Sequence, residues 1–219
     1  MIRDMHFHDF IHAITSALDA KDPFTNEHAR NVSEITCALC DFMGLEDFAD
    51  IHIAAHLHDI GKIGVKDRIL QKPGALEEWE YKEIQRHSRL GARILKDVSP
   101  LKGVALIVRH HHERFDGKGY PDGLAGEDIP LGSRIIAVAD ALDAMTSMRP
   151  YRRPMPFDEA MDELRLHGGT QFDADIVAAA VERQAELRAM AIPAHVEDSA
   201  TWRMVDHDAM MHSRKEVFA

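Results

Sequence analysis

Apolar residues recur every three or four positions along most of the chain, which is the spacing of an amphipathic helix. The first such stretch contains Phe7, Phe10, Ile11, Ile14 and Leu18. Short polar turns with Pro or Gly, such as Lys72-Pro73-Gly74, separate one stretch from the next. Since no alternating run rich in Val, Ile or Thr indicates a strand, the pattern predicts an all-α fold.

Eight helices follow from this pattern. They cover approximately residues 4–18, 26–42, 47–58, 77–96, 101–112, 135–148, 158–166 and 174–187. After about residue 187 the periodic pattern weakens. We therefore expect one domain over residues 1–186 and a C-terminal appendage of unknown role over residues 187–219.

Length and charge exclude several classes of protein. With 219 residues the chain can bury one sizeable core, and no apolar run approaches a membrane span. The net charge of −11 argues against a surface that coats a nucleic acid polymer. Two cysteines exclude a disulfide scaffold. The N-terminus does not read as a secretory signal, so we expect a cytoplasmic protein.

Histidine is the unusual component, with 15 residues against 3 Tyr and 2 Trp. His58 and Asp59 end a predicted helix, and Asp140 interrupts an apolar helix face, where a carboxylate is costly unless it is paired or bound to a metal. Taken alone, His58-Asp59 also fits a core histidine beside a capping carboxylate. Asp140 also fits a hydrogen bond to a helix N-terminus.

Seven residues in or near the predicted helices are candidate metal ligands: His28, His58, Asp59, His87, His111, His112 and Asp140. Five imidazoles and two carboxylates exceed what one tetrahedral metal needs. This number suits two metals with Asp59 as the bridge. Mixed nitrogen and oxygen ligands favour Fe, Mn, Ni or Zn over Mg or Ca.

Two stretches resemble the defining motifs of the HD-GYP domain, a bacterial subgroup of the HD phosphohydrolase superfamily: HDIGK at 58–62 and HHERFDGKGYP at 111–121. The similarity continues through DPFT at 22–25 with His28, ILQKPG at 69–74, ADALDAMT at 139–146, RPYR at 149–152 and GTQFD at 169–173. It covers about residues 10–185. Only about ten residues precede it, so we expect no receiver domain ahead of it in this chain.

The resemblance implies an HD-type bundle of about seven helices with a dinuclear metal site in its core. By motif position, one metal would be held by His28, His58, Asp59 and Asp140. Asp59 would bridge to a second metal, held by His87, His111 and His112. Phe24 stands where some members carry a Glu for a third metal, so we expect two metals. Fe or Mn is favoured, with Ni or Zn as alternatives.

The implied activity is hydrolysis of cyclic di-GMP to linear pGpG and/or GMP through a metal-bridging hydroxide. Asp59 and Lys62 would be catalytic, with Lys62 on the scissile phosphate. Tyr120, Arg149 and Arg152 match positions that contact the ligand in family members. The alternatives are a solvated Lys62, ion-paired arginines and a purely structural loop around Tyr120.

Candidate partners and competing functions come partly from this resemblance and partly from the residues themselves. The family links the Gly-Tyr-Pro loop to docking of diguanylate cyclase (GGDEF) domains, and the wide apolar face of the first helix suits a homodimer. A second hypothesis is a non-catalytic cyclic-dinucleotide sensor or docking module. The intact ligand set argues against it. A third is an HD phosphohydrolase acting on another nucleotide or on 3′,3′ cyclic GMP-AMP.

Overall fold

The computed structural model describes residues 2–21, 27–148 and 153–191. In chain order its α-helices are α1 (Ile2–Lys21), α2 (His28–Phe42), α3 (Ala49–Leu57), α4 (Asp67–Leu70), α5 (Glu78–Leu95), α6 (Lys102–His110), α7 (Leu131–Thr146), α8 (Phe157–His167), α9 (Ala174–Glu182) and α10 (Gln184–Ala191). Three short 3₁₀ helices are η1 (Ile60–Gly64), η2 (Ser99–Leu101) and η3 (Gly126–Asp128). These ranges contain no strand, only one isolated bridge between Gly168 and Phe172. The predicted all-α class is confirmed.

The described residues hold ten α-helices, two more than the eight that the apolar pattern predicts, for two reasons. The short α4 lies in a stretch that carries no helical apolar pattern long enough to predict it. The helix predicted over 174–187 is divided at Arg183, whose φ of −109° and ψ of 24° end α9. The new helix α10 crosses the boundary expected after residue 186, and its Leu187 is fully buried in the core.

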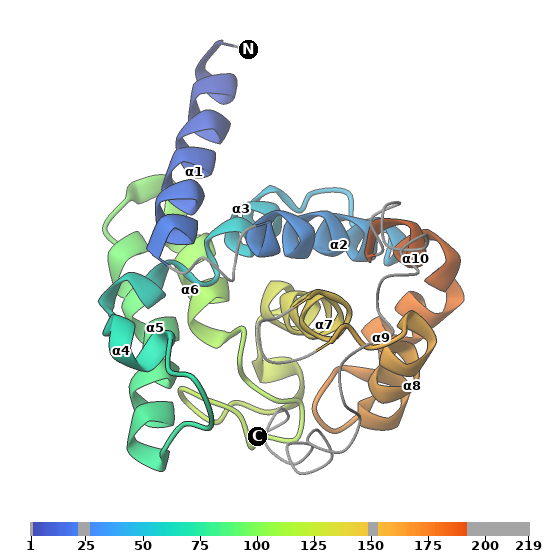
Figure 1. Cartoon of the computed structure of the whole chain (residues 1–219). Coiled ribbons are helices and arrows are strands. Elements are labelled where there is room, and N and C mark those ends of the chain that lie inside the picture. Colours follow the sequence, from blue (N-terminus) through green and yellow to red (C-terminus); the bar gives the residue numbers. More distant parts are fainter. Residues whose placement is uncertain (1, 22–26, 149–152, 192–219) are drawn as a thin grey trace, which may run out of the picture.

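Helix α7 lies at the centre of the bundle. Figure 1 shows it with α2 and α3 on one side, α5 and α6 on another, and α8 to α10 on a third. Its apolar residues Ile135, Ile136, Val138 and Leu142 have no exposed surface. Burying apolar surface is the main favourable term in folding, so α7 fixes how the surrounding helices pack. Any polar side chain on α7 is thereby held among several helices.

A close backbone approach joins η1 to α5. A Cβ atom at Gly61 would lie 1.9 Å from the carbonyl oxygen of His87, so only glycine fits there. The contact brings the segment after His58 and Asp59 directly against the turn of α5 that carries His87. Residues that are 26 or more positions apart in the sequence therefore meet at this crossing.

Helix α1 extends away from the bundle, and only its C-terminal half packs on it (Figure 1). Ile11 and Leu18 are buried, as the apolar pattern predicts. Phe10 is not: 60% of it is exposed, because this part of α1 has few neighbours. Phe7 has no described side chain. Among the residues that the structure describes, no helix is both long enough and apolar enough to span a membrane.

Candidate metal centre

Asp59 lies between two groups of ligand-type side chains. We call His28, His58 and Asp140 the His28 group, and His87, His111 and His112 the His87 group. Within each group the ligand atoms lie within 4.8 Å of one another. Asp59 Oδ2 is 3.4 Å from His58 Nε2, and Asp59 Oδ1 is 3.3 Å from His87 Nε2. One carboxylate thus presents a different oxygen to each group.

The helices supply these side chains from their ends and faces. His28 begins α2, His87 lies within α5, and Asp140 lies on α7. Helix α6 ends at His110, two residues earlier than predicted, and His111 caps it. Because the chain turns there, the adjacent rings of His111 and His112 are both near the ring of His87, at centroid distances of 5.3 and 5.0 Å. The structure therefore brings all seven predicted ligand residues together.

Three of the imidazoles have a defined tautomer. Nδ1 lies 2.7 Å from Ala55 O in His58, 2.8 Å from Ile84 O in His87 and 2.7 Å from Val108 O in His111. A carbonyl oxygen only accepts, so each Nδ1 must carry the proton and donate. In the neutral ring, each Nε2 then presents a lone pair to the centre. Such a second hydrogen bond is what orients metal-ligating histidines in proteins.

The Nε2 atoms lack ordinary partners. His58 is 1% exposed, and its Nε2 has no hydrogen-bond partner among the described residues. The Nε2 atoms of His87 and His111 face each other at 3.3 Å, although neither carries a proton to donate in the neutral rings. Buried polar atoms are normally satisfied, so orphaned lone pairs that converge need a cation. The residues present therefore fit divalent metal ions.

His28 has a carboxylate behind it. Its Nδ1 lies 2.6 Å from Asp143 Oδ2, and its Nε2 is 3.3 Å from Asp140 Oδ1. The other oxygen of Asp143 accepts hydrogen bonds from Asn31 Nδ2 and Ser147 Oγ, at 2.9 and 2.8 Å. Asp143 is thus held in place by two donors while it orients the His28 ring. A carboxylate behind a histidine also raises the basicity of its free nitrogen.

The pKa values of several side chains in the centre are shifted far from their usual range. Burial opposes the charged form of His28, but hydrogen bonds to Asp140 and Asp143 outweigh it and raise its pKa to about 9. Burial would raise the pKa of Asp59, yet Lys62 and His58 hold it well below its usual range. Burial, and then the charge of His87, lower the pKa of His112 to about 3. Burial also holds the pKa of His111 well below its usual range. His111 and His112 are therefore neutral, the ligand form, at neutral pH.

Two of the predicted substrate contacts, Lys62 and Tyr120, lie beside the centre. Lys62 Nζ is 2.6 Å from Asp59 Oδ2, so its ammonium group adjoins the candidate bridging carboxylate. The Tyr120 ring lies over that of His112, at a centroid distance of 4.8 Å and an interplanar angle of 31°. Arg149, Arg152 and Phe24 lie outside the described residues.

Sequence reasoning missed the roles of Asp143 and Glu113. Asp143 stands one helical turn after Asp140, a spacing that places both on the same face of α7 and could have signalled a supporting carboxylate. Glu113 is buried directly after His112, and its carboxylate accepts hydrogen bonds from the backbone N–H groups of Asp122 and Gly123. No local spacing predicts those two contacts.

The chain matches one protein-family model, described as "HD domain", over residues 13–176. The chain belongs to the HD domain family. The recognition made from the sequence motifs is therefore confirmed. HD domains bind divalent metals, and the His28 and His87 groups could hold them.

Two curated relatives carry names of enzymes. The chain is 38% identical over 189 residues to a protein of Thermotoga maritima named "Cyclic di-GMP phosphodiesterase". This alignment covers 83% of this chain and 51% of the relative. It is 39% identical over 178 residues to "3'3'-cGAMP-specific phosphodiesterase 3" of Vibrio cholerae. That alignment covers 80% of this chain and 39% of the relative. The chain thus spans about half or less of the length of these relatives.

A solved structure shares the fold. A cyclic GMP-AMP phosphodiesterase of V. cholerae superposes with a TM-score of 0.64 at 21% identity, over 85% of this chain and 51% of that one. At 21% identity this similarity establishes the helical architecture alone.

Proposed function

We propose that the chain is a metal-dependent phosphodiesterase that hydrolyses cyclic di-GMP to linear pGpG and/or GMP. The observation that carries the proposal is the pair of ligand groups on either side of Asp59, with buried Nε2 lone pairs directed into the centre. The names of the curated relatives support this reaction class.

In this proposal His28, His58, Asp59 and Asp140 hold one divalent ion, and Asp59, His87, His111 and His112 hold a second. Iron or manganese is the proposed metal, with nickel or zinc as the alternatives. Two such ions, when bound, would supply positive charge for the phosphate oxygens and would lower the pKa of a bound water molecule toward neutral pH. Asp59 is ionised because Lys62 and His58 hold its pKa low, so it can bridge without first losing a proton.

The remaining chemistry belongs to side chains around the centre. The Lys62 ammonium is placed to bind a non-bridging oxygen of the scissile phosphate, where negative charge grows in the transition state. The Tyr120 ring offers a flat surface for a guanine base. We propose Arg149 and Arg152 as further contacts to phosphate or base from the sequence motif alone, because a guanidinium group suits either.

A second candidate substrate is 3′,3′ cyclic GMP-AMP. The observation that favours it is the 39% identity to the V. cholerae enzyme named for that nucleotide, which is similar to the 38% identity to the T. maritima protein. Both substrates contain the same 3′–5′ phosphodiester, so the metal centre does not distinguish them. A competition between the two at equal concentration measures the ratio of their kcat/KM values and so decides between them.

A purely non-catalytic sensor is disfavoured by the centre. A protein that only binds a dinucleotide has no need for seven converging ligands, five of them buried, and for Asp143 behind His28. Burying ionisable groups is costly, so their convergence points to a use for the metals.

Location and assembly are further proposals. We place the protein in the cytoplasm, where cyclic dinucleotides act as signals, and we propose docking of a GGDEF domain at the loop around Tyr120. A homodimer through α1 is supported by Phe10, whose exposed ring a second copy would cover. Residues 1–186 form the proposed catalytic domain, and residues 187–219 form a C-terminal appendage of unassigned role.

The test is turnover by protein purified without oxygen, with the metal content measured on the same sample. The variant Asp59→Asn removes the proposed bridge. The matched control is Asp97→Asn, which changes an exposed carboxylate after α5 in the same way. We expect about two metals per chain and linear product from the wild type and from the control. Asp59→Asn should lose at least about 100-fold in activity, because losing a first ligand exceeds the effect of losing an outer partner.

Two results would overturn the proposal. Wild-type protein that holds two metals and leaves cyclic di-GMP intact excludes this substrate. Full activity in Asp59→Asn excludes the role given to the bridge.

A further inference from the structure

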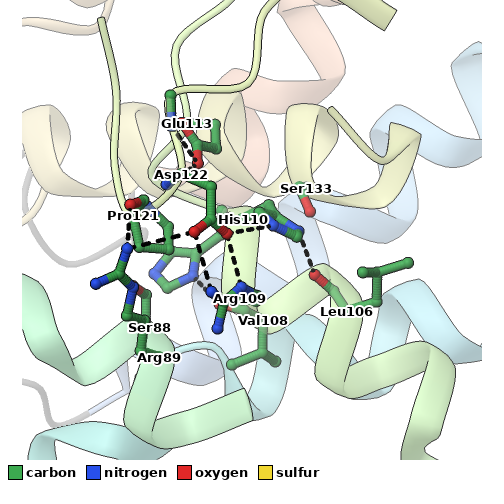
Figure 2. Close-up of polar contacts among 12 residues, drawn as sticks. Ser88, Arg89, Leu106, Val108, Arg109, His110, Glu113, Pro121, Asp122 and Ser133 are labelled. Atoms are coloured by element: carbon green, nitrogen blue, oxygen red, sulfur yellow. Dashed lines mark hydrogen bonds and ion pairs between the residues drawn. The ribbon is translucent and has the colours of Figure 1, made fainter. Parts of the chain in front are cut away.

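A third group of ligand-type side chains lies outside the metal centre. His110, Glu113 and Asp122 have ligand atoms within 4.8 Å of one another. The His110 ring lies between Leu106 and Asp122: its Nδ1 is 3.0 Å from Leu106 O, and its Nε2 is 3.0 Å from Asp122 Oδ2 (Figure 2). The carboxylates of this group already have partners, however, so the group does not resemble a cation site.

Arginine neutralises Asp122. Arg109 donates from Nε to Oδ2 at 2.7 Å and from Nη2 to Oδ1 at 3.0 Å, a two-pronged contact (Figure 2). Arg89 adds a third charged donor, at 3.3 Å from Oδ1. These contacts lower the pKa of Asp122 to about 2, with Arg109 as the main stabilising partner. Bidentate pairs of this kind are among the stronger and more directional polar contacts.

These contacts link one loop to two helices. Asp122 follows Tyr120 by two residues, Arg89 lies on α5, and Arg109 and His110 end α6. Arg89 Nη2 also donates to the carbonyl oxygen of Pro121, at 2.5 Å. Helices α5 and α6 are the elements that carry or precede the His87 group. We call Arg89, Arg109, His110, Glu113 and Asp122 the Asp122 network.

Glu113 holds the same loop from inside. It accepts from the backbone N–H of Asp122 at 2.7 Å and of Gly123 at 3.1 Å. The backbone N–H of Tyr120 in turn donates to the carbonyl oxygen of His112 at 3.2 Å. The loop is therefore hydrogen-bonded both at Tyr120, to His112, and just after it, to Glu113. The Tyr120 ring lies over the ring of His112.

We propose that Asp122 is a positioning residue: the Asp122 network fixes the loop so that the Tyr120 ring forms one wall of the substrate site beside the His87 group. This inference rests on the proposed function, since it assigns the wall to a cyclic dinucleotide. Asp122 and its arginines act through Tyr120 and do not touch the reacting atoms. Their loss should weaken binding of the base and leave the phosphodiester chemistry at the metals in place.

The experiment compares Asp122→Asn, Arg109→Gln and the double variant with the wild type. The control is Glu186→Gln, because Glu186 on α10 forms an equivalent two-pronged contact with Arg183, the residue that ends α9, at 2.6 and 2.8 Å. For each protein we would measure KM and kcat for cyclic di-GMP, metal content, and amide hydrogen exchange in the segment 117–124. The exchange measurement needs no substrate.

We expect KM to rise at least about five-fold in Asp122→Asn, with kcat within about two-fold, because charged hydrogen bonds that held the loop are lost. Metal content should not change. Amides in 117–124 should exchange at least about five-fold faster, because local opening becomes easier. The double variant should be no worse than the worse single variant, since both break one contact. Glu186→Gln should match the wild type.

Three results would overturn the inference. Unchanged exchange in Asp122→Asn means that the network does not hold the loop. Faster exchange with an unchanged KM means that the loop does not position substrate. A fall in metal content means that Asp122 supports the metal centre instead. If the wild type itself leaves cyclic di-GMP intact, the proposed function fails, whereas the exchange data still decide whether the network holds the loop.

Discussion

The candidate metal centre and the Asp122 network both contain histidines and carboxylates, and they differ in how these groups are hydrogen-bonded. In the centre, backbone carbonyls accept hydrogen bonds from Nδ1 of His58, His87 and His111, and the Nε2 lone pairs of these neutral rings have no donor. In the Asp122 network, arginines and backbone N–H groups occupy the carboxylates. Proximity of histidines and acids alone therefore does not define a metal site; unpaired lone pairs do.

Removing the metals should have the largest effect on activity and on Tm. This effect should come from the candidate metal centre and not from the Asp122 network. A chelator is expected to abolish activity and to lower Tm by about 5–10 °C, because a tightly bound ligand stabilises the folded state by a few kcal/mol. Scanning calorimetry before and after metal is restored measures this. Asp122→Asn should show the same drop. A smaller drop in that variant would mean that the network also holds a metal, and the comparison would fail.

Asp143→Asn tests the carboxylate that supports His28. The variant keeps the shape of the side chain and removes the charge that lies 2.6 Å from His28 Nδ1. We expect affinity for the metal of the His28 group to fall about 10- to 100-fold, as is usual for such outer partners. Competition with a coloured chelator measures the affinity, and Asp97→Asn serves again as the control. Wild-type affinity in Asp143→Asn would show that His28 needs no support.

Glu113→Gln examines the other region. Glu113 Oε1 accepts from the backbone N–H groups of Asp122 and Gly123, and Oε2 accepts from Gly123 as well. A glutamine removes the charge and places an NH₂ group, a donor, against one of these donors. The free energy of unfolding should fall by about 1–3 kcal/mol, the usual contribution of hydrogen bonds to a charged group. Denaturant titration measures it, with Glu186→Gln as the exposed counterpart. Metal content should stay at the wild-type value; its loss would place Glu113 in the metal centre.

The smallest effect is expected from pH. The pKa of Asp122 is lowered from 3.8 to about 2 in the folded protein, so its stabilising contribution is complete above about pH 4 and is lost only as pH falls through 2. Exchange in segment 117–124, corrected for intrinsic rates, should therefore give the same protection at pH 7 and pH 4.5. A loss of protection over this range that is absent from Asp122→Asn would contradict the assigned charge state.

The sequence predicted the parts of the molecule that depend on local spacing. The long helices follow from apolar periodicity, and the seven ligand candidates follow from motif position and from Asp140 on an apolar face. Asp122 could not be linked to Arg89 in advance, because 33 residues separate them and only the packing of α5 against the loop brings them together. The break at Arg183 was missed because the apolar pattern continues through it.

Gly61, between Asp59 and Lys62, determines how near to each other the elements that carry the ligands can lie. Because Gly61 has no side chain, the backbones of η1 and α5 are in direct contact. This contact brings Asp59, which precedes Gly61, close to His87 on α5. A methyl group at Gly61 would have to move from 1.9 Å to at least the 3.4 Å of ordinary van der Waals contact. It would act as a wedge that pushes His87 away from Asp59. The absence of a side chain at Gly61 thus determines how closely Asp59 and the His87 group can approach.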